Sequence, residues 1–98
     1  MHVIHDLKTL PEYYWEVVGG AKKAEFRVFD RDYKVDDLLC LREFRDGVYT
    51  GIHCYVRITH VLPVDHLCAK GWAVLSFEFF EHSDSRPEWS ELDGWECF

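Results

Sequence analysis

Strict alternation of charged and apolar residues along residues 23–28 constrains the fold of this chain more than any other feature. A strand turns successive side chains to opposite faces, so Lys23, Glu25 and Arg27 share one face and the apolar residues between them share the other. A second stretch, residues 53–62, alternates in the same way over a longer distance. Both stretches therefore predict strands with two chemically different faces, which is typical of a mostly β domain.

Three further strands and one helix complete the expected elements. Apolar-rich runs predict the strands at residues 3–7, 38–44 and 72–80. A helix is expected to begin at Pro11, which suits the first helical position, and to end at Gly19 and Gly20. The Asp46-Gly47 pair predicts a tight hairpin turn. About five short strands with one early helix close most readily into a small barrel, so the fold prediction is an α+β, mostly β barrel.

The length of 98 residues suits one domain, and the hydrophobic content of 48% excludes a disordered chain. We expect a barrel domain over residues 1–81, followed by an acidic, Trp-containing tail over residues 82–98. From Glu81 onward the chain has six acidic residues and one basic residue, which accounts for −5 of the formal net charge of −7. An overall basic footprint for nucleic acid is therefore missing. Basic residues still cluster locally, at Lys8, Lys22, Lys23, Arg27, Arg31, Lys34 and Arg42.

Cysteine usage and the first residues indicate the compartment. The cysteines are Cys40, Cys54, Cys68 and Cys97, and they form no C-x-x-C pair. The chain begins with no basic segment followed by an apolar one, so we expect no secretory signal and a cytoplasmic location, the host cytoplasm if a phage encodes it. Thiols stay reduced there, and zinc prefers paired ligand spacings, so we expect no disulfide framework, no metal and no cofactor. No apolar run approaches the ~20 residues that cross a bilayer, so no membrane partner is expected.

Several short motifs occur in the same order as in a known family. They are His5-x-Leu7-Lys8, Pro11-Glu12-Tyr13-Tyr14, Gly20-Ala21-Lys22-x-x-Glu25-Phe26-Arg27, Asp30-Arg31-Asp32-Tyr33, Leu41-Arg42-Glu43, Tyr49-Thr50-Gly51 and Val74-Leu75-Ser76-Phe77. With these motifs, residues 2–80 closely resemble a small ASCH-like family of unknown function, found in bacteria and phages and placed in the PUA-like superfamily. The chain departs from that family at Asp36, where the family usually has Gly, and at Lys23, where it often has Thr.

The resemblance implies a PUA-like pseudo-barrel with the helix beside it. In such domains RNA or a modified nucleoside is thought to bind in the cleft between the helix and the barrel. Carried over residue by residue, Lys22, Glu25 and Arg27 of the G-x-K-x-x-E-x-R motif would line that cleft. The matched positions at its rim are Lys8, Arg31 and Arg42.

The chemistry of these residue types suits a nucleotide. Arg27 offers a planar fork of donors for a phosphate or a base edge, and Lys22 offers a compact positive charge. Glu25 can accept a hydrogen bond from an exocyclic amine. An aromatic ring, Tyr49 or Tyr33, would stack on a base. We therefore predict an RNA- or nucleotide-binding module rather than an enzyme.

Plainer structural roles and an enzymatic role stay open beside this prediction. Lys22 follows a helix C-terminus, where a cation offsets the helix dipole, and Glu25 with Arg27 would also make a surface ion pair. Some ASCH relatives resemble amidohydrolases that remove an acyl group from modified cytidine with a Lys, a Thr and a Glu. Lys22 matches the Lys of that set, and Glu25 occupies the position of the Thr. An amidohydrolase would use Lys22 as nucleophile or base.

A third hypothesis concerns the acidic tail. Small acidic phage proteins can occupy the nucleic-acid site of a host protein by presenting carboxylates. Trp89 and Trp95 stand among the acidic residues of the tail and are typical of interface hot spots. The alternative is that these two side chains simply pack onto the barrel.

Overall fold

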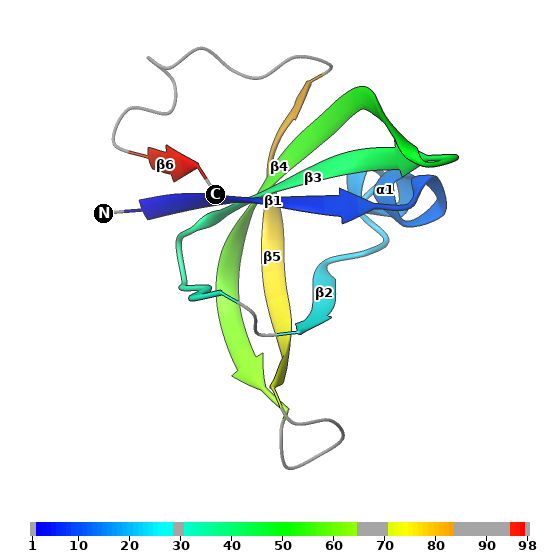
Figure 1. The fold of residues 1–98 in the computed structure, drawn as a ribbon. Helices are drawn as coiled ribbons and strands as arrows, with labels where there is room; N and C mark the ends of the chain where they lie inside the picture. Colours follow the sequence, from blue (N-terminus) through cyan, green and yellow to red (C-terminus); the bar gives the residue numbers. More distant parts are fainter. Residues whose placement is uncertain (1, 29–30, 65–70, 84–94, 98) are drawn as a thin grey trace.

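The structure is a computed structural model that describes residues 2–28, 31–64, 71–83 and 95–97. Its elements in chain order are β1 (His2–Thr9), α1 (Pro11–Val18), β2 (Ala24–Val28), β3 (Leu38–Arg45), β4 (Val48–Pro63), β5 (Trp72–Ser83) and β6 (Trp95–Cys97). The strands form one sheet in the order β2-β5-β4-β3-β1-β6 (Figure 1). β1 runs parallel to β3 and β6, and the other neighbours are antiparallel. The prediction of a mostly β domain with one early helix is confirmed.

The sheet has two edges, so it is not closed. The hydrogen-bonded order of the described strands runs from β2 to β6 and does not return to β2. The barrel that the sequence predicts is therefore not confirmed. β6 pairs with β1 only from His2 to Ile4. Beyond Ile4, β1 has a partner strand, β3, on one side only within the described residues.

Two strands differ from the sequence prediction. The Asp46-Gly47 pair has φ values of 51° and 85°, which fits the predicted tight hairpin turn. β4 starts directly after this turn at Val48 and ends at Pro63, so it is longer than the alternating stretch 53–62 that predicted it. Within the segment expected to be an irregular acidic tail, residues 95–97 form β6, while residues 84–94, with Trp89, lie outside the described residues.

The helix α1 begins at Pro11 and ends before Gly19, as predicted. Tyr14 and Val17 are its buried residues, whereas Tyr13 is 47% exposed, so α1 buries only a narrow stripe. With eight residues, α1 is far too short to cross a bilayer, and no other described segment forms a membrane-spanning helix.

The sheet buries side chains on both faces, and α1 covers one of them. On this inner face the core consists of Leu7, Tyr14, Val17, Tyr33, Leu39, Leu41, Cys54, Val56, Ile58, Ala73, Leu75 and Phe77. A smaller cluster buries the opposite, outer face, with Ile4, Leu38, Cys40 and Tyr55. Because side chains alternate along a strand, the continuous apolar run of β3 supplies both clusters.

The faces of β2 are the reverse of what its polarity suggests. Glu25 and Arg27 pair directly with Leu75 and Ala73 of β5, which belong to the inner core, so the charged face of β2 is the inner face. Phe26 is 47% exposed on the outer face. Glu25 and Arg27 do form an ion pair, but it lies on the inner face of the sheet rather than on the outer surface.

The connection between β2 and β3 is fixed by Asp37. Its carboxylate accepts hydrogen bonds from His5 Nε2 at 2.9 Å and from the backbone N–H of Val3 at 3.2 Å. The Tyr33 ring packs against the His5 ring at 4.7 Å and is buried, so Tyr33 cannot stack on a ligand base as the sequence suggested. These contacts hold residues 31–37 against β1 and β4, where Asp36 donates its N–H to the carbonyl of Ile58 at 2.8 Å.

Candidate functional site

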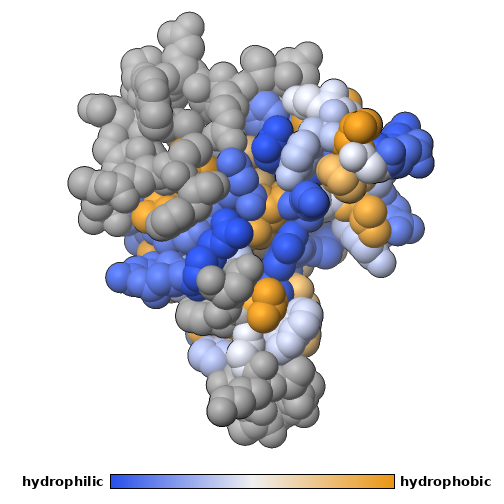
Figure 2. Space-filling view, in the orientation of Figure 1, coloured by the Kyte–Doolittle hydropathy of each residue, from blue (hydrophilic) through white to orange (hydrophobic). Residues whose placement is uncertain are grey.

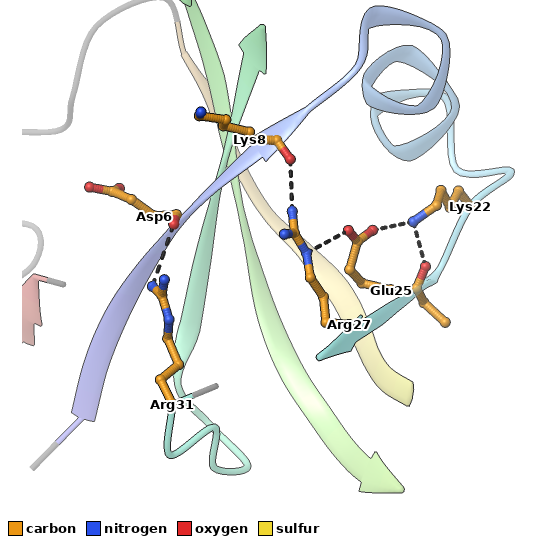
Figure 3. A network of polar contacts seen from close by, with 7 residues as sticks. Asp6, Lys8, Lys22, Glu25, Arg27 and Arg31 are labelled. Carbon is orange, nitrogen blue, oxygen red and sulfur yellow. Dashed lines mark hydrogen bonds and ion pairs between the residues drawn. The ribbon is translucent and has the colours of Figure 1, made fainter. Parts of the chain in front are cut away.

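Three motif residues form one connected network on the inner face of β2 (Figure 3). Lys22 Nζ donates to Glu25 Oε1 and to the carbonyl oxygen of Ala24, the latter at 2.6 Å. Arg27 Nε donates to the other carboxylate oxygen of Glu25 at 3.1 Å. Arg27 Nη2 then reaches the carbonyl oxygen of Lys8 in β1 at 2.7 Å. The structure therefore brings together the residues expected to line the cleft and ties them to β1.

The local sequence explains why Lys22 lies where it does. After α1 ends, the N–H groups of Ala21 and Lys22 both donate to the carbonyl of Glu16, which turns the chain back toward the sheet. The carbonyl of Lys23 then accepts a hydrogen bond from the N–H of Phe77 at 3.0 Å and starts the pairing with β5. The Lys22 side chain bonds to Glu25 rather than to the last carbonyls of the helix, so its charge serves the network more than the helix dipole.

A surface pocket adjoins this network between the end of α1 and β5. Its volume is about 280 Å³, and its lining residues are Val17, Gly20, Lys22, Lys23, Phe77, Glu78 and Phe79. The Lys22 Nζ atom lies 5.9 Å from the centre of the Phe77 ring. The pocket thus combines apolar walls with a cation at its rim.

The remaining expected residues do not join this network. The Lys8 side chain points away from Arg27, as Figure 3 shows, and its Nζ atom lies 4.7 Å from the centre of the Phe44 ring. Arg42 stacks on Tyr49, with 3.9 Å from Cζ to the ring centre. Lys8, Arg42 and Tyr49 therefore form a second group on the outer face, and the sequence treated the two groups as one site.

Arg27 and Arg31 both donate hydrogen bonds to backbone carbonyl groups of β1. Arg31 Nη1 donates to the carbonyl of Asp6 at 3.5 Å, two residues before Lys8, whose carbonyl accepts from Arg27. Both carbonyl groups lie beyond Ile4, where the pairing with β6 ends. In Figure 2 hydrophilic side chains gather over β1 in the middle of the visible face. The two guanidinium groups thus bond to backbone acceptors of β1 beyond its pairing with β6.

Sequence reasoning missed a buried carboxylate under the helix. Glu43 is 2% exposed and accepts a hydrogen bond from Trp15 Nε1 at 2.8 Å. Burial, then the neighbouring Cys54 thiol and Glu43, raises the pKa of the Tyr14 phenol well above its ordinary value. The only signal in the sequence was an acidic residue inside the apolar run of β3. Its bond to Trp15 makes Glu43 an anchor for α1.

The comparisons with known proteins give a family and one relative. The family model described as "Domain of unknown function (DUF3850)" matches residues 4–77. The chain is also similar to the "Uncharacterized 12.9 kDa protein in GpA 3'region" of Escherichia phage P2, with 44% identity over 61 residues. That alignment covers 62% of this chain and 56% of the relative, so the chain spans little more than half of the relative's length. The expectation of a family of unknown function with phage members is confirmed.

Proposed function

We propose, for a chain that belongs to the DUF3850 family of domains of unknown function, that the network of Lys22, Glu25 and Arg27 binds RNA or a nucleotide at the adjoining pocket. The observation that carries this proposal is the inward charged face of β2, which lies beside a pocket and whose two cations still reach solvent. Apolar side chains would bury more surface there than charged ones do, so a ligand that uses the charges gives one reason for the arrangement.

The network leaves donors for such a ligand. Glu25 uses one oxygen for Lys22 and the other for Arg27, so it positions the two cations. The Lys22 and Arg27 side chains are 23% and 28% exposed, so both can reach solvent. Among the hydrogen bonds of the described residues, Arg27 Nη1 takes part in none. Two cations against one carboxylate leave a net positive charge, which suits a phosphate or an acceptor edge of a base.

The pocket size limits the ligand to something small. A volume of about 280 Å³ lies at the lower end of the range for small-molecule sites. Phe77 and Phe79 supply apolar walls of the kind on which single bases pack. A single nucleotide, free or at an unpaired position of an RNA chain, therefore fits better than a duplex.

The finer assignment to the ASCH-like, PUA-like domains belongs to this proposal. A helix beside a mostly β sheet and a motif at the seam between β1 and β2 support it. In a closed pseudo-barrel that seam would join the two strands. Here the Arg27 side chain of β2 bonds to the Lys8 carbonyl of β1 and so links the two strands in place of backbone hydrogen bonds.

The test is a binding titration of the full chain against single-stranded and duplex RNA and DNA at low and moderate salt. The double variant Lys22→Ala/Arg27→Ala is compared with Lys34→Ala/Arg45→Ala, which removes the same charge at side chains that are 69% and 57% exposed. We expect salt-dependent binding of single-stranded RNA that the first variant loses and the second keeps. Equal binding by both variants, or no binding by the native chain, would refute the proposal.

The two other hypotheses are tested alongside. Turnover of N4-acylated cytidine by the native chain but not by Lys22→Ala would make the site an amidohydrolase. Deleting the acidic segment is unsuitable as a test of a protein-binding regulator, because it would also remove β6, which pairs with β1. Neutralising Glu88 and Glu91 by substitution with Gln changes the charge and leaves residues 95–97 in place.

A further inference from the structure

Three basic residues line up across the outer face of the sheet. Lys8 of β1 pairs directly with Arg42 of β3, and Arg42 pairs directly with His53 of β4. Direct partners project from the same face, and neighbouring strands lie about 4.8 Å apart, so the row spans about 10 Å. On the same face, Asp6 precedes Lys8 by two residues. The row therefore carries a net positive charge on a protein whose net charge is −7.

Aromatic rings, rather than carboxylates, hold the two cations of this row, Lys8 and Arg42. Lys8 lies over Phe44 and Arg42 lies over Tyr49, and the two rings meet edge to face with 5.1 Å between their centres. Within the described residues neither Lys8 nor Arg42 contacts a carboxylate. In contrast, Lys22, Arg27, Lys34, Arg45 and Arg57 each contact a carboxylate. The charges of Lys8 and Arg42 are thus fixed in place without being neutralised.

We propose that Lys8, Arg42, Phe44 and Tyr49 form a second contact surface, which takes the backbone of a single-stranded nucleic acid. Lys8 and Arg42 bind consecutive phosphates, and one base stacks on the Arg42–Tyr49 pair, whose Tyr ring is 42% exposed. Unneutralised cations interleaved with rings suit a strand that offers phosphates and flat bases in alternation. An acidic protein segment would use the cations alone.

Lys8 connects this surface to the network on the inner face. Its carbonyl oxygen accepts from Arg27, while its side chain lies over Phe44 on the other side of β1. A strand whose terminal nucleotide occupies the pocket beside Lys22 would pass over the end of β1 onto the outer face. The inference therefore rests on the proposed function. It adds that a nucleic acid must be several nucleotides long to contact both the pocket and the outer surface.

The test measures the affinity of the full chain for a uridine dinucleotide and a uridine dodecamer over a salt series. For Lys8→Gln/Arg42→Gln we expect at least a tenfold loss for the dodecamer, none for the dinucleotide, and a salt slope smaller by about 1.4, from two phosphate contacts. Tyr49→Leu should weaken the dodecamer about tenfold, whereas Tyr49→Phe keeps the ring and the affinity. Thermal melts confirm that each variant is folded, and Lys34→Gln/Arg45→Gln is the charge-matched control.

The outcomes separate this inference from the proposed function. If Lys22→Ala/Arg27→Ala abolishes binding of both ligands while Lys8→Gln/Arg42→Gln changes neither, the outer surface is refuted and the pocket stands. If only the outer variant loses the dodecamer and the inner variant keeps both ligands, the outer surface stands and the pocket falls. If polyglutamate displaced the bound dodecamer as well as unlabelled dodecamer does, and Tyr49→Leu did not change the affinity, the nucleic-acid surface would be refuted. An acidic protein partner would then be favoured.

Discussion

β2 and β3 differ in the side chains that they turn toward the inner and outer faces of the sheet. Residues 38–41 of β3 are fully buried, with Leu39 and Leu41 on the inner face and Leu38 and Cys40 on the outer face. β2 turns Glu25 and Arg27 inward and leaves Phe26 half exposed on the outside. β3 lies inside the sheet, between β4 and β1, whereas β2 is an edge strand with β5 as its one partner among the described strands. Position in the sheet, rather than the alternation pattern, therefore decides what a face can carry.

Inward charges on an edge strand have two explanations that differ in their consequences. Edge strands with charged residues that point inward resist pairing with other chains, which is a protective role. In this chain the same charges also reach across the seam to the Lys8 carbonyl and adjoin a pocket. A protective role requires only the charges, whereas a ligand site also requires the geometry that Glu25 imposes on Lys22 and Arg27.

The largest expected difference between the two strands is in the free energy of unfolding. Leu41→Ala in β3 should lower it by about 2–5 kcal/mol, because it empties a fully buried site. Phe26→Ala in β2 should cost less than about 1 kcal/mol, because the ring is already half exposed. Urea unfolding of both variants measures the difference. Equal losses would mean that the outer face of β2 is covered and that the comparison is wrong.

A second prediction concerns pH and the inner core beside β3. Burial raises the pKa of the Cys54 thiol from 9.0 to about 11, and a bond with Tyr14 opposes part of this rise. Between these values the unfolded chain loses the proton first, so the native state binds more protons and stability falls as the pH rises. The fall attributable to Cys54 is about 2–3 kcal/mol from pH 9 to pH 11.

Unfolding curves at several pH values test this prediction. The Cys54→Ala variant starts from a lower stability, because it loses buried volume, but it should lose less with rising pH. The raised pKa of Tyr14 adds a further decline at higher pH, and Cys54 contributes to that raised pKa, so the difference between the two proteins reports the whole effect of the Cys54 thiol. Parallel curves would contradict a buried, protonated thiol at Cys54.

The third prediction concerns the charged face of β2 itself. Glu25→Gln should lower the free energy of unfolding by about 1–2 kcal/mol, because Lys22 and Arg27 lose their shared, largely buried carboxylate. That cost exceeds the loss for Phe26→Ala, so the charged residue would matter more to stability than its apolar neighbour. Glu78→Gln, at an exposed pair with Arg57, is the control and should cost at most about 1 kcal/mol. A smaller loss for Glu25→Gln than for Glu78→Gln would show that the network contributes nothing.

The sequence predicts the elements better than it predicts their arrangement. Periodicity locates the five longer strands, Pro11 and Gly19 bound the helix, and the Asp46-Gly47 pair marks the hairpin. These features are local, so local residue types suffice to reveal them. The three-residue β6 has no such signal, since its pairing with β1 joins residues that are far apart in the chain.

The candidate site shows the same limit. The spacing of Lys22, Glu25 and Arg27 indicates one cluster, and the structure brings these residues together. Spacing cannot tell which face of β2 turns inward, because that depends on the pairing with β5. It also cannot reveal that Lys8 joins the network through its carbonyl group rather than its side chain, since the carbonyl lies in the plane of the sheet while the side chain projects from the outer face.

The smallest expected effect lies in the connection between the two strands, at Asp36. Its φ of 77° is left-handed, which favours Gly. Gly and Ala substitutions both remove the ion pair with Arg57, so the difference between them isolates the backbone contribution. We expect Asp36→Gly to be more stable than Asp36→Ala by about 1 kcal/mol in urea unfolding, and Asp36→Asn to lie near the native chain. Equal stability of the Ala and Gly variants would mean that the backbone at residue 36 adjusts to the side chain. The start of β3 would then not be fixed by this conformation, and the contrast with β2 would not extend to the connection between them.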